Sequence, residues 1–246
     1  MTDSMYQHAA FYRMLHHGRS EDLEFYLSAT QGCGTVLEYG VGSGRVALPM
    51  ARRGQRVVGV DLSEDMLASL REDLAREEPE VRQRLTLVHA NARQLELPER
   101  FDAVTCPFNG IAHHHDHAEL SAFLARVRSH LRPGGVFVLD VSLPDPPMLA
   151  GMTGEVPWFR DPVDGTVCRA TEQVEYDALT QVLTITTTTR AMETEREPIT
   201  MELRLRQLFP QETELLLRHH GFTVVQRELD LPGVIGYVCR VDAEAR

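Results

Sequence analysis

Short apolar runs alternate with amphipathic stretches between residues 36 and 142. The runs that suit strands are 36–40, 56–61, 85–90, 101–108 and 135–142. Apolar residues between them recur at helical spacing, for example at Leu120, Phe123, Leu124, Val127 and Leu131. Because strands alternating with helices are typical of βαβ units, the pattern predicts a mostly parallel sheet with helices on both faces.

Polar residues at the starts of two expected helices support their boundaries. Ser63 is placed to cap a helix over 64–78, whose first turn carries two acidic residues. Asp116 or His117 is placed to cap a second helix over 118–131. Arg132-Pro-Gly-Gly135 then ends that helix.

The periodicity changes at the Pro-rich segment 144–147. Residues 166–177, 181–193 and 199–208 alternate apolar with polar positions, are rich in β-branched residues and have no helices between them. The α/β pattern returns with a helix over 210–220 and strands near 222–229 and 236–242. We therefore expect an α/β core of residues 1–145 and 208–246, with residues 146–207 inserted as a β-rich lid or interface subdomain.

Composition and charge narrow the class of protein. A chain of 246 residues with 43% hydrophobic and 25% charged residues suits one globular domain with a large insertion. No apolar run approaches the roughly 18 residues of a membrane span, and the N-terminus lacks the features of a secretory signal. The four cysteines are scattered, which favours a reducing cytoplasm. A net charge of −11 disfavours nucleic acid and leaves small molecules or peptides as partners.

A glycine-rich turn follows the first expected strand of the core. Gly40, Gly42 and Gly44 allow a sharp turn and a close approach of backbone N–H groups to a ligand. Asp61, at the tip of the next strand, can accept both ribose hydroxyl protons. The order G-x-G-x-G differs from the dinucleotide pattern G-x-G-x-x-G, and Glu38 would repel a pyrophosphate but attract an ammonium group. The sequence thus favours a nucleoside cofactor with an amino-acid part.

Residues 36–45 and 58–67 resemble the first two signature motifs of the class I S-adenosylmethionine-dependent methyltransferases. Leu131–Val136 and the C-terminal helix and strands also resemble that family, and the bacterial small-molecule subgroup is the most similar. The resemblance implies a Rossmann-like sheet of seven strands, one of them antiparallel. It also implies in-line transfer of a methyl group from S-adenosyl-L-methionine to nitrogen or oxygen of a small metabolite or peptide, with S-adenosyl-L-homocysteine as product.

The family motifs map onto individual residues of this chain. The resemblance places the methionine part of the cofactor at Glu38 and the glycines, the ribose at Asp61, and the adenine against Leu62 and Met66. Asn91 stands where the family usually has an aspartate for the adenine amine, and its amide oxygen can still accept one hydrogen bond. The residues expected at the cofactor are Glu38, Gly40, Gly42, Gly44, Asp61, Leu62, Met66, Asn91, Ala92 and Pro107.

The segment after the fourth strand is expected to border the methyl acceptor, because ligands of open α/β sheets lie beyond the carboxyl ends of the strands. A histidine of the similar subgroup matches His113, which is our candidate general base; the alternative is that it only lines the pocket. His113 and His117 are the only helix-spaced pair in the run from 113 to 117, so we expect no metal site.

Several other residues are candidates for the lid or the acceptor site. In the similar proteins the N-terminal helices cover the cofactor, which suggests Tyr6, Tyr12 and Arg19, although an amphipathic stripe packed on the sheet explains the aromatics equally. The remaining candidates are Phe108, Asn109 and Trp158. Trp158, just before the expected meander, could contact an acceptor or the partner subunit of a homodimer.

Two rival functions stay open. One is a nicotinamide-dependent oxidoreductase, and the other is a non-catalytic regulator that binds S-adenosylmethionine. The acceptor, the methylated atom and the oligomeric state are not determined by the sequence.

Overall fold

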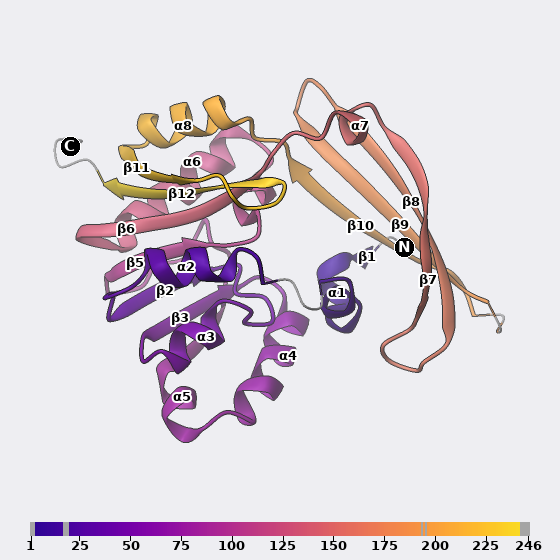
Figure 1. Ribbon diagram of the computed structural model, residues 1–246, viewed down its shortest axis with the longest axis horizontal. Coiled ribbons are helices and arrows are strands. Elements are labelled where there is room, and N and C mark those ends of the chain that lie inside the picture. The colour runs from indigo at the N-terminus through magenta and orange to yellow at the C-terminus, as the bar shows by residue number, and fades with distance from the viewer. Residues whose placement is uncertain (1–2, 17–19, 193, 195, 242–246) are drawn as a thin grey trace.

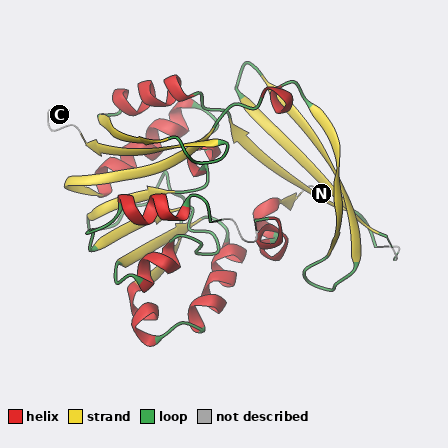
Figure 2. Cartoon of the chain, in the orientation of Figure 1, coloured by secondary structure: helices red, strands yellow, loops and turns green. Residues whose placement is uncertain are grey.

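The computed structural model describes residues 3–16, 20–192, 194 and 196–241. Two separate sheets dominate the fold, and the larger one carries helices on both faces (Figure 1; Figure 2). Each helix in the described ranges is too short or too polar to traverse a bilayer.

The larger sheet has seven strands in the order β11-β12-β6-β5-β2-β3-β4. Strands β2 to β6 run parallel, and β12 is antiparallel to both of its neighbours. The expected fold, with one antiparallel strand near the end of the chain, is therefore confirmed. The strands are β2 Thr35–Tyr39, β3 Arg56–Asp61, β4 Leu85–His89, β5 Phe101–Cys106, β6 Leu131–Ser142, β11 Phe222–Glu228 and β12 Val234–Val241.

Helices cover both faces of this sheet because its strands are apolar on both sides. One core cluster joins α6 and α8 to the sheet, and the other joins α2, α3 and α4 to the opposite face. Ser63 caps α4 and Asp116 caps α6 through their side chains, as expected. The helices are α2 Leu23–Ala29, α3 Ala47–Arg52, α4 Glu64–Ala75, α5 Pro79–Arg84, α6 His117–His130 and α8 Pro210–His219.

The smaller sheet has five strands in the order β1-β10-β9-β8-β7. The three strands expected from the sequence are present as β8 Val167–Asp177, β9 Val182–Ala191 and β10 Ile199–Arg206. The sequence pattern did not reveal β1 Asp3–Ser4 or β7 Met152–Arg160, which α7 Pro146–Leu149 precedes. Placing Trp158 before the meander was therefore wrong, because it lies within β7.

The N-terminal segment lies between the two sheets (Figure 1). It consists of β1, the 3-10 turn η1 Met5–Gln7 and α1 Ala9–Leu15. Strand β1 pairs in parallel with β10, and Phe11 packs against Phe159 with 5.4 Å between ring centroids. The N-terminal segment thus covers the edge of the large sheet where its parallel strands end.

Candidate functional site

The turn between β2 and α3 is built from three glycines with left-handed φ. Gly40, Gly42 and Gly44 have φ of 68°, 53° and 82°. A Cβ on Gly44 would overlap Leu70 of α4, so this glycine allows the turn to pack closely on the helix. Gly40 and Gly42 border a cavity, where their small size keeps the backbone accessible to a ligand.

Asp61 at the tip of β3 is linked directly to this turn. Its carboxylate accepts hydrogen bonds from the backbone N–H groups of Gly42, at 2.8 Å, and Ser63, at 2.9 Å. Burial raises the pKa of Asp61, while these N–H groups act in the opposite direction. The two sequence motifs therefore form a single site.

Glu38 lies beneath the turn with 1% of its surface exposed. The first N–H of α3, from Ala47, donates to its carboxyl group. Among the described residues, Glu38 Oε2 has no hydrogen-bond partner. Burial raises the pKa of Glu38 to about 8, although Arg45 acts in the opposite direction. A buried acid with an unused oxygen is suited to a cationic group of a ligand.

Arg45 connects the glycine turn to two other elements. It forms a bidentate ion pair with Asp22, which is 2% exposed, and its guanidinium carbon lies 5.6 Å from the centroid of the Phe108 ring. Through these contacts, Arg45 holds the turn against the start of α2 and the segment after β5.

A cavity of about 890 Å³ lies at the carboxyl ends of the parallel strands. The core supplies most of its wall, and the N-terminal segment and β10 close the opposite side. The residues expected at the site from the sequence that line it are Gly40, Gly42, Asp61, Leu62, Met66, Asn91, Ala92, Pro107, Tyr6, Tyr12, Phe108 and His113.

One end of the cavity offers an apolar surface for a base. Leu62 is 66% exposed, whereas Met66 is 1% exposed and lies beneath Gly42. The Asn91 side-chain oxygen already accepts hydrogen bonds from Arg93, at 3.0 Å from its backbone nitrogen and 3.4 Å from Nε. The side-chain amide N–H groups of Asn91 are therefore what it offers to a ligand, rather than the oxygen expected from the sequence.

His113 and Tyr6 meet in the wall of the same cavity. His113 Nε2 and the Tyr6 hydroxyl are 2.8 Å apart. Burial lowers the pKa of His113 to about 4 and raises that of Tyr6, so both groups are neutral at physiological pH. The backbone carbonyl of Tyr6 also accepts a hydrogen bond from Ser63 Oγ at 2.7 Å. Tyr6 thus spans from the turn after β3 to His113.

The neighbouring histidines have different partners. His114 stacks on Phe123 with 4.3 Å between ring centroids, and His115 Nε2 lies 3.0 Å from the carbonyl oxygen of Arg204. Within the described part of the chain, no three His, Cys, Asp or Glu residues are arranged to hold a metal ion.

The turn between β5 and His113 has an unusual backbone. The sequence suggested a strand to residue 108, but β5 ends at Cys106 because Phe108 and Asn109 adopt φ of 58° and 55°. Such a conformation costs about 1–2 kcal/mol for a residue such as Phe108, whereas asparagine adopts it more readily. The backbone N–H groups of Phe108 and Asn109 donate to Asp140, at 2.6 and 2.9 Å.

Asp140 was not identified from the sequence. It is 1% exposed and also accepts a hydrogen bond from the hydroxyl of Tyr26. Burial raises its pKa, and its three donors act in the opposite direction. The available signal was a single carboxylate within the apolar run 136–141.

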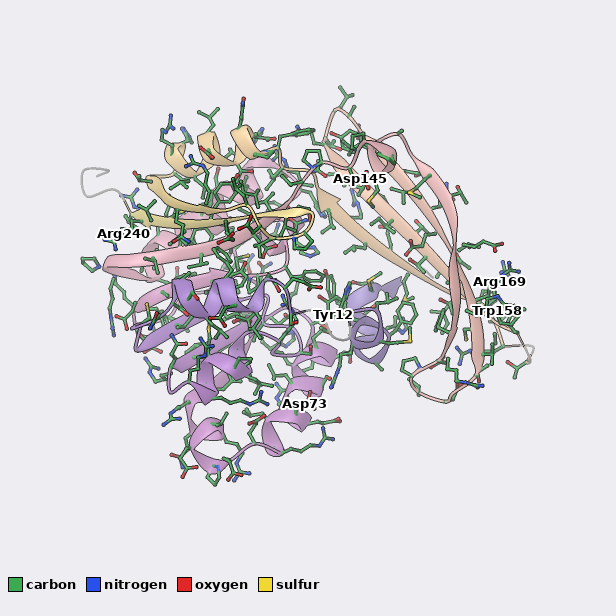
Figure 3. The ribbon with its side chains drawn as sticks, in the orientation of Figure 1. Tyr12, Asp73, Asp145, Trp158, Arg169 and Arg240 are labelled. Carbon is green, nitrogen blue, oxygen red and sulfur yellow. The ribbon has the colours of Figure 1, made fainter. Side chains whose placement is uncertain are left out.

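Four of the expected residues that the structure describes do not line the cavity: Glu38, Gly44, Asn109 and Trp158. Glu38 is buried beneath the glycine turn, and Gly44 of that turn packs against Leu70 of α4. The Asn109 side chain accepts a hydrogen bond from the Ser142 backbone. Trp158 is 63% exposed at the outer edge of the small sheet, whereas Tyr12 lies between the sheets (Figure 3). Arg19 falls outside the described residues.

The polar groups around the cavity fit a ligand that carries both a nucleoside and an amino-acid group. The glycine turn offers accessible backbone, Asp61 faces the cavity, and the Glu38 carboxyl has an unused buried oxygen. Glu38, the turn and Asp61 would hold the amino-acid and ribose parts, while Leu62 would cover the base.

Comparison with known proteins supports this interpretation. Residues 36–135 match a family described as a methyltransferase domain. The chain is 31% identical over 140 residues to dTDP-3-amino-3,6-dideoxy-α-D-glucopyranose N,N-dimethyltransferase of Streptomyces fradiae, covering 54% of this chain and 52% of that protein. It is 33% identical over 110 residues to the cypemycin N-terminal methyltransferase of a Streptomyces species, covering 45% and 42%. The chain thus spans about half the length of the curated relatives it matches.

A solved structure extends the similarity to most of the chain. The CcbJ methyltransferase from Streptomyces caelestis is 27% identical, and the match covers 91% of this chain and 90% of that one with a TM-score of 0.76. The matched length includes both sheets, so the inserted strands belong to the shared architecture.

Proposed function

We propose that this chain, whose residues 36–135 match a methyltransferase domain, is a class I S-adenosylmethionine-dependent methyltransferase that methylates a nitrogen atom of a small amine. The observation that carries this proposal is the neutral His113–Tyr6 pair in a cavity that also contains the glycine turn. S-adenosylmethionine, the cofactor of the family, supplies an electrophilic methyl group on a sulfonium when it is bound.

The low basicity of His113 favours nitrogen over oxygen as the acceptor atom. With a pKa of about 4, His113 is unprotonated at neutral pH but is a weak base. A neutral amine already has a nucleophilic lone pair and needs only orientation, whereas a hydroxyl group must lose its proton during the reaction. His113 and Tyr6 are suited to the first task, because each can accept or donate a hydrogen bond without carrying charge.

The acceptor class we favour is an amino sugar. One of the matched relatives is named for an amino sugar, and another for a peptide N-terminus. Both names specify amines. The cavity, bounded by Tyr6, Tyr12 and Phe108 on its acceptor side, offers the ring surfaces and neutral polar atoms on which a sugar can pack.

Transfer of a tritiated methyl group tests the proposal. The purified chain is incubated with methyl-labelled S-adenosylmethionine and dTDP-3-amino-3,6-dideoxyglucose. The matched control acceptor carries a 3-hydroxyl group in place of the amine. We expect label in the amino sugar and not in the hydroxy sugar. Equal labelling of the two sugars would contradict nitrogen selectivity.

The same measurement separates methyl transfer from a regulatory role. A regulator would bind S-adenosylmethionine in a calorimeter yet label no amine from a panel of amino sugars and peptide N-termini. The cavity volume of about 890 Å³, which leaves room for an acceptor beside a nucleoside cofactor, supports the enzymatic alternative. A nicotinamide-dependent oxidoreductase would instead bind NADH tightly and S-adenosylhomocysteine weakly, so titration with both ligands tests that alternative.

A further inference from the structure

The turn that leads from β5 to His113 adopts a conformation that Phe108 disfavours. Phe108 and Asn109 are consecutive non-glycine residues with left-handed φ of 58° and 55°. Such a turn persists only where the surroundings hold it. The contacts that hold it come from β6 and α2, which are distant in sequence.

Asp140 of β6 binds both residues of the turn. Its Oδ1 accepts the Phe108 N–H at 2.6 Å, and its Oδ2 accepts the Asn109 N–H at 2.9 Å. The fully buried Tyr26 of α2 donates its hydroxyl proton to the same carboxylate. The Tyr26 oxygen also lies 3.5 Å from the carbonyl oxygen of Cys106, the last residue of β5.

The turn carries the acceptor end of the cavity. The Phe108 ring lines the cavity and lies 6.3 Å from the ring of Tyr12 and 4.8 Å from that of His16, centroid to centroid. Immediately after the turn, the 3-10 helix η2 Gly110–His113 ends at the histidine that contacts Tyr6. The glycine turn and Asp61 belong to β2, α3 and β3, and the glycine turn contacts this turn through Arg45, whose guanidinium carbon lies 5.6 Å from the centroid of the Phe108 ring.

We infer that Asp140, oriented by Tyr26, is a positioning residue that places Phe108 and His113 for the acceptor without taking part in cofactor binding. The inference rests on the proposed amine methylation. An error of about 1 Å in the position of a reacting group can reduce a rate by roughly 100-fold. A change at Asp140 should therefore act on catalysis, although Asp140 does not line the cavity.

Two variants perturb the pair in different ways. Asp140→Asn keeps the shape of the side chain but leaves one oxygen to accept hydrogen bonds from three donors, so at least one buried N–H loses its partner. Tyr26→Phe removes only the hydroxyl group. It is the milder change and remains informative if Asp140→Asn fails to fold.

The sheet offers matched controls away from the cavity. Asp102 also accepts two backbone N–H groups, from Gly34 at 3.0 Å and Thr35 at 2.9 Å. Tyr237 is fully buried, and its hydroxyl lies 3.5 Å from the carbonyl oxygen of Pro210. Asp102→Asn and Tyr237→Phe therefore report the general cost of losing such contacts.

Three measurements test the inference: the Kd for S-adenosylhomocysteine, kcat/KM for dTDP-3-amino-3,6-dideoxyglucose, and the side-chain NMR signals of His113. The last are assigned by comparison with His113→Gln. For Asp140→Asn we expect a fall in kcat/KM of about tenfold or more, a Kd within about threefold of the unmodified protein, and displaced His113 signals. Tyr26→Phe should lower kcat/KM and displace the His113 signals to a smaller extent. The controls Asp102→Asn and Tyr237→Phe should lower the melting temperature and leave kcat/KM, Kd and the His113 signals unchanged.

Two results would overturn the inference. One is a loss of S-adenosylhomocysteine affinity in Asp140→Asn that matches the loss of kcat/KM. The other is a fall in kcat/KM in Asp102→Asn as large as that in Asp140→Asn. If the unmodified protein methylates no amine, the proposed function fails, and the NMR signals still decide the positioning role: unmoved His113 signals in Asp140→Asn would refute it.

Discussion

The buried carboxyl group of Glu38 predicts that cofactor binding releases a proton. Glu38 has a pKa of about 8, so at pH 7 about ten of eleven molecules carry the proton on this group. The ammonium group of S-adenosylmethionine favours the ionised carboxylate when the two are close. Binding at pH 7 should therefore release about 0.9 proton from Glu38.

The same pKa sets the cost to affinity. Ionising a group one pH unit below its pKa costs about 1.4 kcal/mol, which weakens binding by about tenfold at pH 7 relative to a pH well above 8. The contribution of Glu38 to affinity should rise from pH 6 to pH 8 and level off above pH 8. Titration of the amine in the free ligand is common to every protein and cancels when the Kd of a variant is divided by that of the unmodified protein.

Titration calorimetry in two buffers of different ionisation enthalpy measures the released protons. When Glu38→Gln binds S-adenosylmethionine at pH 7, it should release about 0.9 proton fewer than the unmodified protein. The Kd of Glu38→Gln divided by the Kd of the unmodified protein should grow with pH. Glu24→Gln, at an exposed acid of α2, is the control and should change neither quantity. Equal proton release from Glu38→Gln and the unmodified protein would refute the reasoning.

Three further predictions concern stability. Gly44→Ala should lose about 3 kcal/mol of unfolding free energy in urea, because it combines a φ of 82° with overlap of Leu70; a loss under 1 kcal/mol would contradict this. Arg45→Met should cost about 3–5 kcal/mol by leaving Asp22 buried and unpaired, and a neutral result in the same assay would count against it. His114 is 8% exposed, and burial lowers its pKa to about 3, below the value in the unfolded chain. Because the unfolded chain therefore binds more protons, stability is lost as pH falls from about 6.5 towards 3. His114→Gln should lower this slope by up to about 1.4 kcal/mol per pH unit in chemical denaturation, and an unchanged slope would refute the assignment.

The contact between the glycine turn and Asp61 was predictable because these residues are close in sequence. The glycine turn lies between one strand and one helix, and Asp61 ends the next strand, so adjacent parallel strands bring them together. The hydrogen bond between Asp61 and the Gly42 N–H follows from that local arrangement. The orientation of Asn91 could not be predicted, because Arg93 competes for the same oxygen.

The acceptor end was only partly predictable because it is formed by distant segments. Tyr6 and His113 were both candidates, but nothing in their separation of 107 residues indicated that they share a hydrogen bond. Strand β7 contains glycine and proline, which conceal its strand character, and pairing with β8 accounts for it. Trp158 does not line the cavity and lies on the exposed edge strand β7, a position that its place in the sequence did not indicate.

The sequence by itself determined the α/β core, the inserted strands and the type of cofactor site, because hydrophobic periodicity and short-range motifs encode local structure. Only the tertiary structure revealed that Asp140 and Tyr26 hold the left-handed turn at Phe108 and Asn109. A buried carboxylate takes its role from the donors that folding brings to it. Those donors lie on α2 and on the turn after β5, which no periodic pattern connects to β6.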